Sequence, residues 1–122
     1  MLGYRKKLGA WGEELARRFY EEQGYSFITA NWRKRFAEVD LIFKIKTDLV
    51  FVEVKTRTSD KFGYGEQSVT WSKKQKISRA MDSFVDENLE YKDYFPRFDI
   101  LVVELFSLRP EFVHYENVCL HD

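Results

Sequence analysis

The sequence of 122 residues predicts an α/β domain in which helices flank a mixed central β-sheet. Three observations predict this fold class. Two stretches repeat apolar residues every three to four positions, as amphipathic helices do. Between them, two stretches alternate apolar and polar residues with the two-residue period of half-buried strands. A nearly continuous apolar stretch follows the second helix and indicates a strand buried on both faces.

The first helix is predicted over residues 8–23, because Gly24 stands where a C-terminal cap is expected. Residues 25–32 are rich in β-forming side chains and predict the first strand. The apolar stripe of the helix comprises Leu8, Trp11, Leu15 and Phe19.

The next two strands are predicted over residues 37–46 and 49–57. Only Thr47 and Asp48 separate them, and a two-residue loop favours an antiparallel hairpin. In that register Asp40 lies opposite Lys55, and Glu53 is its diagonal neighbour on the same polar face. The opposite face collects the apolar residues Val39, Leu41, Phe43, Ile45, Val50, Val52 and Val54.

The rest of the chain supplies one more helix and two more strands. Residues 58–70 are polar and glycine-containing, so they predict a loop. A second helix is predicted over residues 72–89, a buried strand over 98–106 and an edge strand over 112–115. The order is therefore α-β-β-β-α-β-β, which implies a mixed sheet with helices packed on it. A chain of this length is expected to form one domain, residues 1–122.

Two carboxylates and a lysine share the polar face of the predicted hairpin: Asp40, Glu53 and Lys55. Like charges on a half-buried face repel each other, and a hard divalent cation relieves that repulsion. Mg²⁺ is usually held by one or two carboxylates together with water and substrate phosphate oxygens. The alternative interpretation is an ordinary solvated hairpin face with cross-strand ion pairs.

The charge is unevenly distributed along a chain whose net charge is zero. Residues 1–80 contain 17 Lys and Arg against 10 Asp and Glu, a net of +7, whereas residues 81–122 contain 3 against 10, a net of −7. Such asymmetry indicates a basic surface for nucleic acid, although charge runs are also typical of solvated helix faces. The candidate phosphate-binding residues are Arg33, Arg35, Arg57, Lys73, Lys74 and Lys76.

Composition excludes several classes of protein. A hydrophobic content of 44% argues against disorder. No apolar run approaches the roughly 20 residues that cross a membrane, and the basic start of the chain lacks the apolar segment of a secretory signal. Cys119 is the single cysteine, which fits a reducing compartment. We therefore expect a cytoplasmic protein without a membrane partner.

The sequence also resembles a known family. The ordered pieces are Gly12-Glu13, Gly24-Tyr25, Asn31-Trp32-Arg33, Glu38 to Ile42, Phe51 to Arg57, Lys74, Ala80 and Arg97-Phe98-Asp99. Together they closely resemble the YraN-like family of small bacterial proteins, which is similar to archaeal Holliday-junction resolvases within the restriction-endonuclease-like PD-(D/E)xK superfamily. One departure is Ala37, where the family usually has glycine.

The resemblance implies a restriction-endonuclease-like fold and assigns roles to four residues. Asp40 matches the first acidic position of the superfamily, and Glu53 with Lys55 matches the E-x-K half. Glu13 matches a glutamate of the first helix that completes the metal site. The implied metal ligands are Asp40, Glu53 and Glu13, with Mg²⁺ or Mn²⁺ as the cofactor.

These observations predict a Mg²⁺-dependent endonuclease, a hydrolase that cleaves phosphodiester bonds in DNA, with branched or structured DNA as the expected substrate. A non-catalytic nucleic-acid-binding module that retains the nuclease fold is the alternative. A protein-interaction domain that uses the acidic last third of the chain is a third interpretation. A homodimer is compatible with each of them.

Overall fold

The computed structural model describes residues 2–58 and 69–121, so most of the loop predicted over residues 58–70 lies outside the described residues. The observed order is α-β-β-β-α-β-β, as predicted, with one additional short 3₁₀ turn, η2. The elements are α1 (Leu2–Glu22), β1 (Ser26–Lys34), β2 (Ala37–Ile45), β3 (Asp48–Arg57), α2 (Trp71–Glu87), η2 (Leu89–Tyr91), β4 (Phe95–Glu104) and β5 (Glu111–Tyr115).

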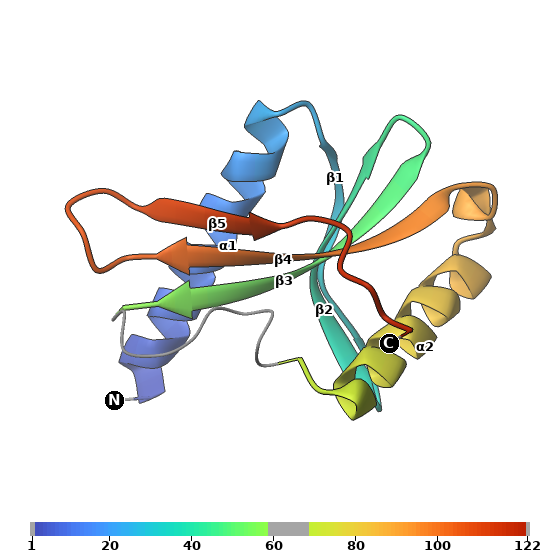
Figure 1. The fold of residues 1–122 in the computed structure, drawn as a ribbon, viewed down its shortest axis with the longest axis horizontal. Coiled ribbons are helices and arrows are strands. Elements are labelled where there is room, and N and C mark those ends of the chain that lie inside the picture. Colours follow the sequence, from blue (N-terminus) through green and yellow to red (C-terminus); the bar gives the residue numbers. More distant parts are fainter. Residues whose placement is uncertain (1, 59–68, 122) are drawn as a thin grey trace.

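The five strands form one mixed sheet in the order β1-β2-β3-β4-β5 (Figure 1). Three of the four pairings are antiparallel, whereas β3 and β4 are parallel. Parallel neighbours need a crossover connection, and α2 lies within the segment that connects β3 to β4. The predicted α/β class with a mixed central sheet is therefore confirmed.

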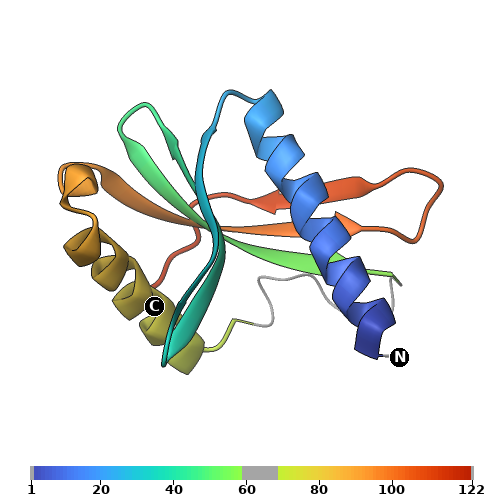
Figure 2. The same cartoon turned by 180° about the vertical axis from the view of Figure 1, so that it is seen from behind.

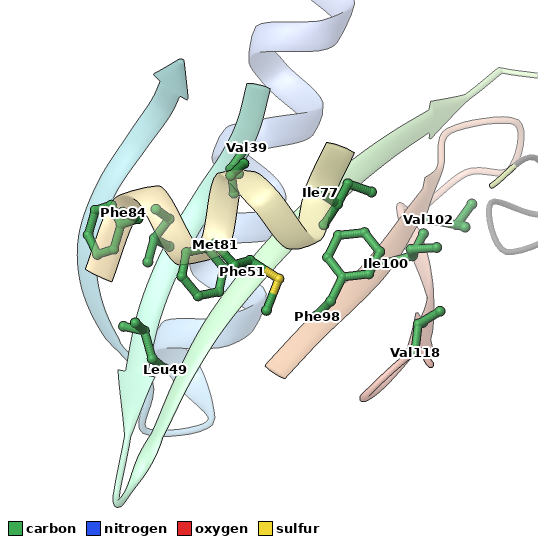
Figure 3. Packing of buried hydrophobic residues seen from close by; sticks show 12 residues of the cluster. Val39, Leu49, Phe51, Ile77, Met81, Phe84, Phe98, Ile100, Val102 and Val118 are labelled. Carbon is green, nitrogen blue, oxygen red and sulfur yellow. The ribbon is translucent and has the colours of Figure 1, made fainter. Parts of the chain in front are cut away.

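The two helices cover opposite faces of the sheet (Figures 1 and 2). Successive residues of a strand point to opposite faces, so Val50 packs in the cluster under α1 and Phe51 in the cluster under α2. Figure 3 shows the second cluster, in which Ile77, Met81 and Phe84 of α2 meet the sheet. Among the described residues, no helix is both long and apolar enough to cross a membrane.

Helix α1 approaches β3 through a glycine. A Cβ atom at Gly12 would overlap the Oγ1 atom of Thr56, so any larger residue would force the Thr56 side chain or the helix to shift. The buried residues of α1 that the structure describes are Gly12, Ala16 and Tyr20. Trp11, which was predicted to belong to the buried stripe, is 48% exposed. The close contact fixes the height of the next residue, Glu13, above the sheet.

The hairpin of β2 and β3 differs from the predicted register by two residues. Ile45 pairs with Asp48 and Leu41 with Val52, so the turn is Lys46–Thr47 rather than Thr47–Asp48. Lys46 takes a left-handed φ of 51°, which the tight turn requires. The predicted pairing of Asp40 with Lys55 is therefore wrong; continued by one residue beyond Leu41, the observed register brings Asp40 level with Glu53.

The two strands separate beyond the Leu41–Val52 pair, where the regular pairing of β2 with β3 ends. We call this opening the fork. Val39 lies beyond it and packs in the α2 cluster, whereas Leu41 packs in the α1 cluster. The prediction that both share one apolar face is wrong, because β2 twists as it leaves β3.

A buried polar network joins α1, β4 and β5 at the centre of the molecule. Asp99 is fully buried, and its oxygens accept hydrogen bonds from Tyr20, Arg97 and the backbone N–H of Asn117, with His114 Nε2 at 2.8 Å. Burial raises the pKa of Asp99, but the bonds from His114, Arg97 and Asn117 outweigh it and hold this pKa below the ordinary value. The network links α1 to β4 and β5, and it gives His114 partners, Asp99 and Tyr20, that the sequence had not indicated.

Candidate functional site

Asp40 lies in the fork, in the plane of the sheet. Its Oδ2 atom accepts a hydrogen bond of 2.8 Å from the backbone N–H of Val54, which would otherwise pair with a carbonyl of β2. The prediction that Asp40 and Glu53 share one face of a regular hairpin is therefore corrected. The carboxylate occupies the gap between the strands, while Glu53 continues the Leu49–Phe51 alternation on the face that α2 covers.

Electrostatics at Asp40 are unfavourable for an isolated carboxylate. Burial raises the pKa of Asp40 from 3.8 to about 7. The hydrogen bond from Val54 opposes this rise, whereas the charges of Glu13, Glu53 and Glu38 add to it. Four acidic side chains therefore influence one another around the fork, and a positive charge placed among them would be stabilised.

Glu13 reaches the same region from α1. A cavity of about 360 Å³ lies between α1 and the fork, and Glu13 and Asp40 both line it together with Val54 and Thr56. Burial raises the pKa of Glu13, a hydrogen bond from the Asn31 side chain opposes the rise, and the charge of Glu38 adds to it. Two carboxylates from different elements thus open onto one solvent-filled space.

Glu53 lies on the α2 side of the fork, between two lysines. Its Oε1 atom is 2.8 Å from the Nζ atom of Lys73 and 3.3 Å from that of Lys55. Its Oε2 atom is buried and has no hydrogen-bond partner among the described residues. A buried carboxylate oxygen without a donor is costly, and a cation or a water bound to a cation would satisfy it.

The two lysines respond differently to this setting. Burial lowers the pKa of Lys55, and the neighbouring charge of Lys73 lowers it further, against the opposing effect of Glu53. Burial also acts to lower the pKa of Lys73, but its hydrogen bond and charge interaction with Glu53 outweigh this and raise it. Lys73, from the first turn of α2, is therefore the lysine whose charged form Glu53 stabilises more strongly.

The carboxylates around the fork carry oxygen atoms, the ligand type that hard divalent cations prefer. Asp40 lies in the fork, Glu13 faces the cavity on the α1 side, and Glu53, with its unpartnered Oε2 atom, lies on the α2 side. Within the described residues, no three His, Cys, Asp or Glu side chains are grouped so that they could hold a metal ion, so the structure does not bring Asp40, Glu53 and Glu13 together as one ligand set. Mg²⁺ can be held by one or two carboxylates, because it usually keeps several waters.

The six residues predicted to bind phosphate fall into two groups. Arg33 and Arg35 lie at the β1–β2 turn, where Arg33 pairs with Glu38 at 3.1 Å. The second group comprises Lys73, Lys74 and Lys76 in the first half of α2, and Arg57 at the end of β3. The buried Nε atom of Arg57 has no hydrogen-bond partner among the described residues. Of these six residues, Lys73 is the one that the described contacts join to Glu53 of the site.

Sequence reasoning gave no role to Asn31. This residue has a left-handed φ of 53° inside β1, and its side chain acts to lower the pKa of Glu13. The sequence contains a signal for it, because asparagine is the non-glycine residue that most readily takes this conformation. The sequence alone does not show, however, that Asn31 lies inside an uninterrupted strand, so its left-handed conformation could not be predicted.

Comparison with known proteins places the chain in a family. Residues 12–103 match the family described as "Uncharacterised protein family UPF0102". The chain belongs to the UPF0102 family. UPF0102 proteins similar to it include one from Alkaliphilus oremlandii, 36% identical over 92% of this chain and 97% of that protein. One from Caldanaerobacter subterraneus is 38% identical over 93% and 90%, and one from Caldicellulosiruptor bescii is 42% identical over 83% of each.

Membership of the UPF0102 family confirms the resemblance to YraN-like proteins. The matched residues 12–103 contain Glu13, Asp40, Glu53 and Lys55 together with all of α2. The family description names no activity, so the function rests on the chemistry of the site.

Proposed function

We propose that this protein is a Mg²⁺-dependent endonuclease, acting on DNA as a single domain formed by residues 1–122. The observation that carries the proposal is the partly buried Asp40 carboxylate in the fork, whose pKa burial and three neighbouring carboxylates raise to about 7. A fold that places acids where their charges destabilise each other gains from a cation at that position. The partner implied by the chemistry is nucleic acid, and the compartment that fits a chain with one cysteine is the cytoplasm.

Asp40 and Glu53 would hold the cation, with Glu13 contributing from the side of the cavity. A bound Mg²⁺ or Mn²⁺ supplies a water of lowered pKa and neutralises charge on a phosphoryl oxygen. Lys55 carries three N–H donors and no acceptor, so it would orient a water or stabilise an oxyanion rather than bind metal. Its lowered pKa also eases loss of a proton from the ammonium group.

The basic residues around the fork would hold the substrate backbone. Lys73, Lys74 and Lys76 of α2, with Arg57 at the end of β3, can neutralise phosphates near the acidic site. Arg33 and Arg35 extend this positive charge to the β1–β2 turn. Branched or otherwise structured DNA is the substrate we propose, following the resemblance to junction resolvases.

Metal binding and cleavage together test the proposal. Titration of Mn²⁺ into the protein by calorimetry should give a saturable heat that Asp40→Asn and Glu53→Gln each weaken at least tenfold. Lys55→Met should leave metal affinity within about threefold and abolish cleavage of branched DNA, because an ammonium is not a ligand. Lys46→Met, at the far end of the hairpin, is the matched control and should cleave normally.

A non-catalytic nucleic-acid-binding module is the second candidate. It is favoured by the two ammonium groups that already neutralise one oxygen of Glu53. In that case the protein would bind DNA, show no saturable Mn²⁺ heat and cleave none of a branched, a flapped or a single-stranded substrate. DNA binding without metal binding would therefore replace the nuclease proposal by this one.

A further inference from the structure

Trp71 is the first residue of α2, and its large side chain is 62% exposed. The backbone beneath it is fixed, because the Thr70 side chain caps the helix by accepting a hydrogen bond of 3.2 Å from the backbone N–H of Lys73. A tryptophan offers a broad apolar face and has only two side-chain torsions to order on binding. An exposed indole at a capped helix start is therefore suited to stack on a planar ligand.

A pocket of about 390 Å³ adjoins the ring, between α2 and the C-terminal segment that lies alongside it (Figure 1). This volume falls within the range of small-ligand sites, roughly 300–1,000 Å³. The pocket is lined by Trp71, Gln75, Ser78, Arg79, Leu120 and His121. Besides the indole, the lining offers an amide, a hydroxyl, a guanidinium and an imidazole, which are groups that can bond the edge of a nucleobase.

The charge beside the pocket favours an anionic ligand. The first half of α2 contains four basic residues and no acid: Lys73, Lys74, Lys76 and Arg79. Apart from Lys73, none of these forms an ion pair with a described residue. The Arg79 guanidinium lies 4.2 Å from the centre of the Phe36 ring, a contact that holds the group without neutralising it. Nucleic acid, with its phosphates and flat bases, has the matching chemistry.

The start of α2 also connects the pocket to the candidate site. Lys73 lies two residues after Trp71, and its Nζ atom is 2.8 Å from Glu53 Oε1. Residues two apart on a helix point to different sides, so one turn of α2 presents Lys73 to the site and Trp71 to the pocket. A helix is about 10–12 Å across with its side chains, a width that a few nucleotides span. One DNA strand can therefore reach both places.

We propose that Trp71 and the adjoining pocket form a nucleobase-binding subsite that takes an unpaired nucleotide of the DNA. The base stacks on the indole, and the basic residues of the first half of α2 contact the neighbouring phosphates. A paired base is already stacked within its duplex, so only a single-stranded segment offers a free base face. The inference rests on the proposed function in requiring DNA, and it specifies the substrate as DNA with a single-stranded segment.

Fluorescence anisotropy with two labelled strands of equal length, in metal-free buffer, tests the inference. One strand is oligothymidine, and the other is abasic, with the same phosphates and no bases. We expect Trp71→Ala to weaken oligothymidine binding about tenfold and binding of the abasic strand less than about twofold, because only the stacking is lost. Trp71→Phe should keep the oligothymidine affinity within about threefold. Phe95→Ala is the matched control, since Phe95 is 67% exposed and does not line the pocket.

The emission of Trp71 supplies a second readout. A base stacked on an indole quenches its fluorescence, so oligothymidine should quench the wild-type protein and the abasic strand should not. Trp71→Phe should bind oligothymidine and lose most of the quenching, because the remaining tryptophans lie elsewhere. Trp11 belongs to α1, and Trp32 packs against Phe84 in the core.

Equal losses for oligothymidine and the abasic strand in Trp71→Ala overturn the inference, because Trp71 would then act on phosphate contacts or on the fold. Unchanged oligothymidine affinity, an equal loss in Phe95→Ala, or full quenching in Trp71→Phe overturns it as well, and cleavage of branched DNA by the wild-type protein then leaves the proposed function standing. A selective loss in Trp71→Ala, with no cleavage by the wild-type protein, supports the subsite and removes the nuclease. A wild-type protein that does not bind oligothymidine has no such subsite.

Discussion

Asp40 shows how one side chain can replace a backbone group. In a regular ladder the N–H of Val54 would pair with a carbonyl of β2, but the strands have separated there and the carboxylate of Asp40 accepts instead. The bond satisfies a buried donor, which a folded chain must do. It also holds an ionisable group in a partly buried gap, where burial raises its pKa to about 7.

Asp40→Asn should stabilise the metal-free protein at pH 8. The folded-state pKa lies above the ordinary 3.8, so the folded protein keeps the proton where the unfolded chain has lost it. Wild-type stability should therefore fall as the pH rises from about 4 to about 7 and then level off. The asparagine variant keeps the acceptor for Val54 without the charge, and should gain roughly 1–3 kcal/mol at pH 8 and almost nothing at pH 3.5.

Urea unfolding of both proteins across this pH range measures the difference between them. Saturating Mg²⁺ should stabilise the wild-type protein at pH 8 and leave the Asp40→Asn variant nearly unchanged. A pH-independent difference between the two proteins would show that the Asp40 carboxyl has an ordinary pKa.

Lys73→Met should strengthen metal binding while weakening DNA binding. In the metal-free protein the Lys73 ammonium lies 2.8 Å from Glu53 Oε1, so it competes with a cation for that carboxylate. Removing it should raise Mn²⁺ affinity a few-fold by calorimetry and lower affinity for DNA by fluorescence anisotropy. Lys74→Met is the matched control, because the neighbouring lysine should affect DNA alone. Weaker Mn²⁺ binding in Lys73→Met would contradict the competition.

At the scale of the elements, the strands were predictable and their register was not. Alternation located β2 and β3 to within a residue, because side chains must segregate between two faces. The turn was misplaced because the alternation was continued through Lys46, which left only Thr47 and Asp48 between the two predicted strands. The tertiary structure decides otherwise: Thr47 O accepts from Phe95 N–H, and Asp48 pairs with Arg97 at 3.5 Å. Both contacts come from β4, which no local pattern can reveal.

Gly12→Ala should separate α1 from the sheet. The new methyl group would overlap Thr56 Oγ1, and overpacking of this kind typically costs about 1–3 kcal/mol. Because Glu13 is the next residue, Mn²⁺ affinity should fall as well. Thr56→Ala should partly restore both quantities in the double variant, measured by urea unfolding and calorimetry. Gly9→Ala is the control, since a Cβ there meets nothing within 4 Å. Additive effects of Gly12→Ala and Thr56→Ala would refute the contact.

At the scale of the whole molecule, charge counting gave an incomplete picture. Two of the ten acids in residues 81–122, Asp99 and Glu104, are buried and add nothing to an acidic surface. Asp99 instead anchors the network with Tyr20, Arg97 and His114, whose members are up to 94 positions apart in sequence. Such long-range contacts are set by the packing of α1 against β4 and β5. The uneven distribution of charge along the chain was predictable from the sequence. Which of the acidic residues are buried in the core was not.

DNA affinity should fall steeply with salt because phosphate contacts release counterions. With about five contacts, an increase from 50 to 200 mM salt should weaken binding on the order of 10²–10³-fold. Neutralising Lys74 and Lys76 to glutamine should reduce the slope of log affinity against log salt by about 2. The same change at Lys92 and Arg109, in the acidic third, is the control and should leave the slope unchanged. A flat salt dependence of the wild-type protein would exclude a phosphate-binding surface.

The hydrogen bond from Val54 to Asp40 gives the site an internal spectroscopic probe. The proton of this amide is held by a side chain rather than by a neighbouring strand, so its chemical shift and its exchange with solvent should follow the charge of that carboxylate. In the metal-free protein the Val54 signal should titrate near pH 7, whereas the amides of Val52 and Phe51 should not. A cation that keeps Asp40 ionised should move that titration to lower pH. A single backbone resonance can thus report ligand binding without any label at the site.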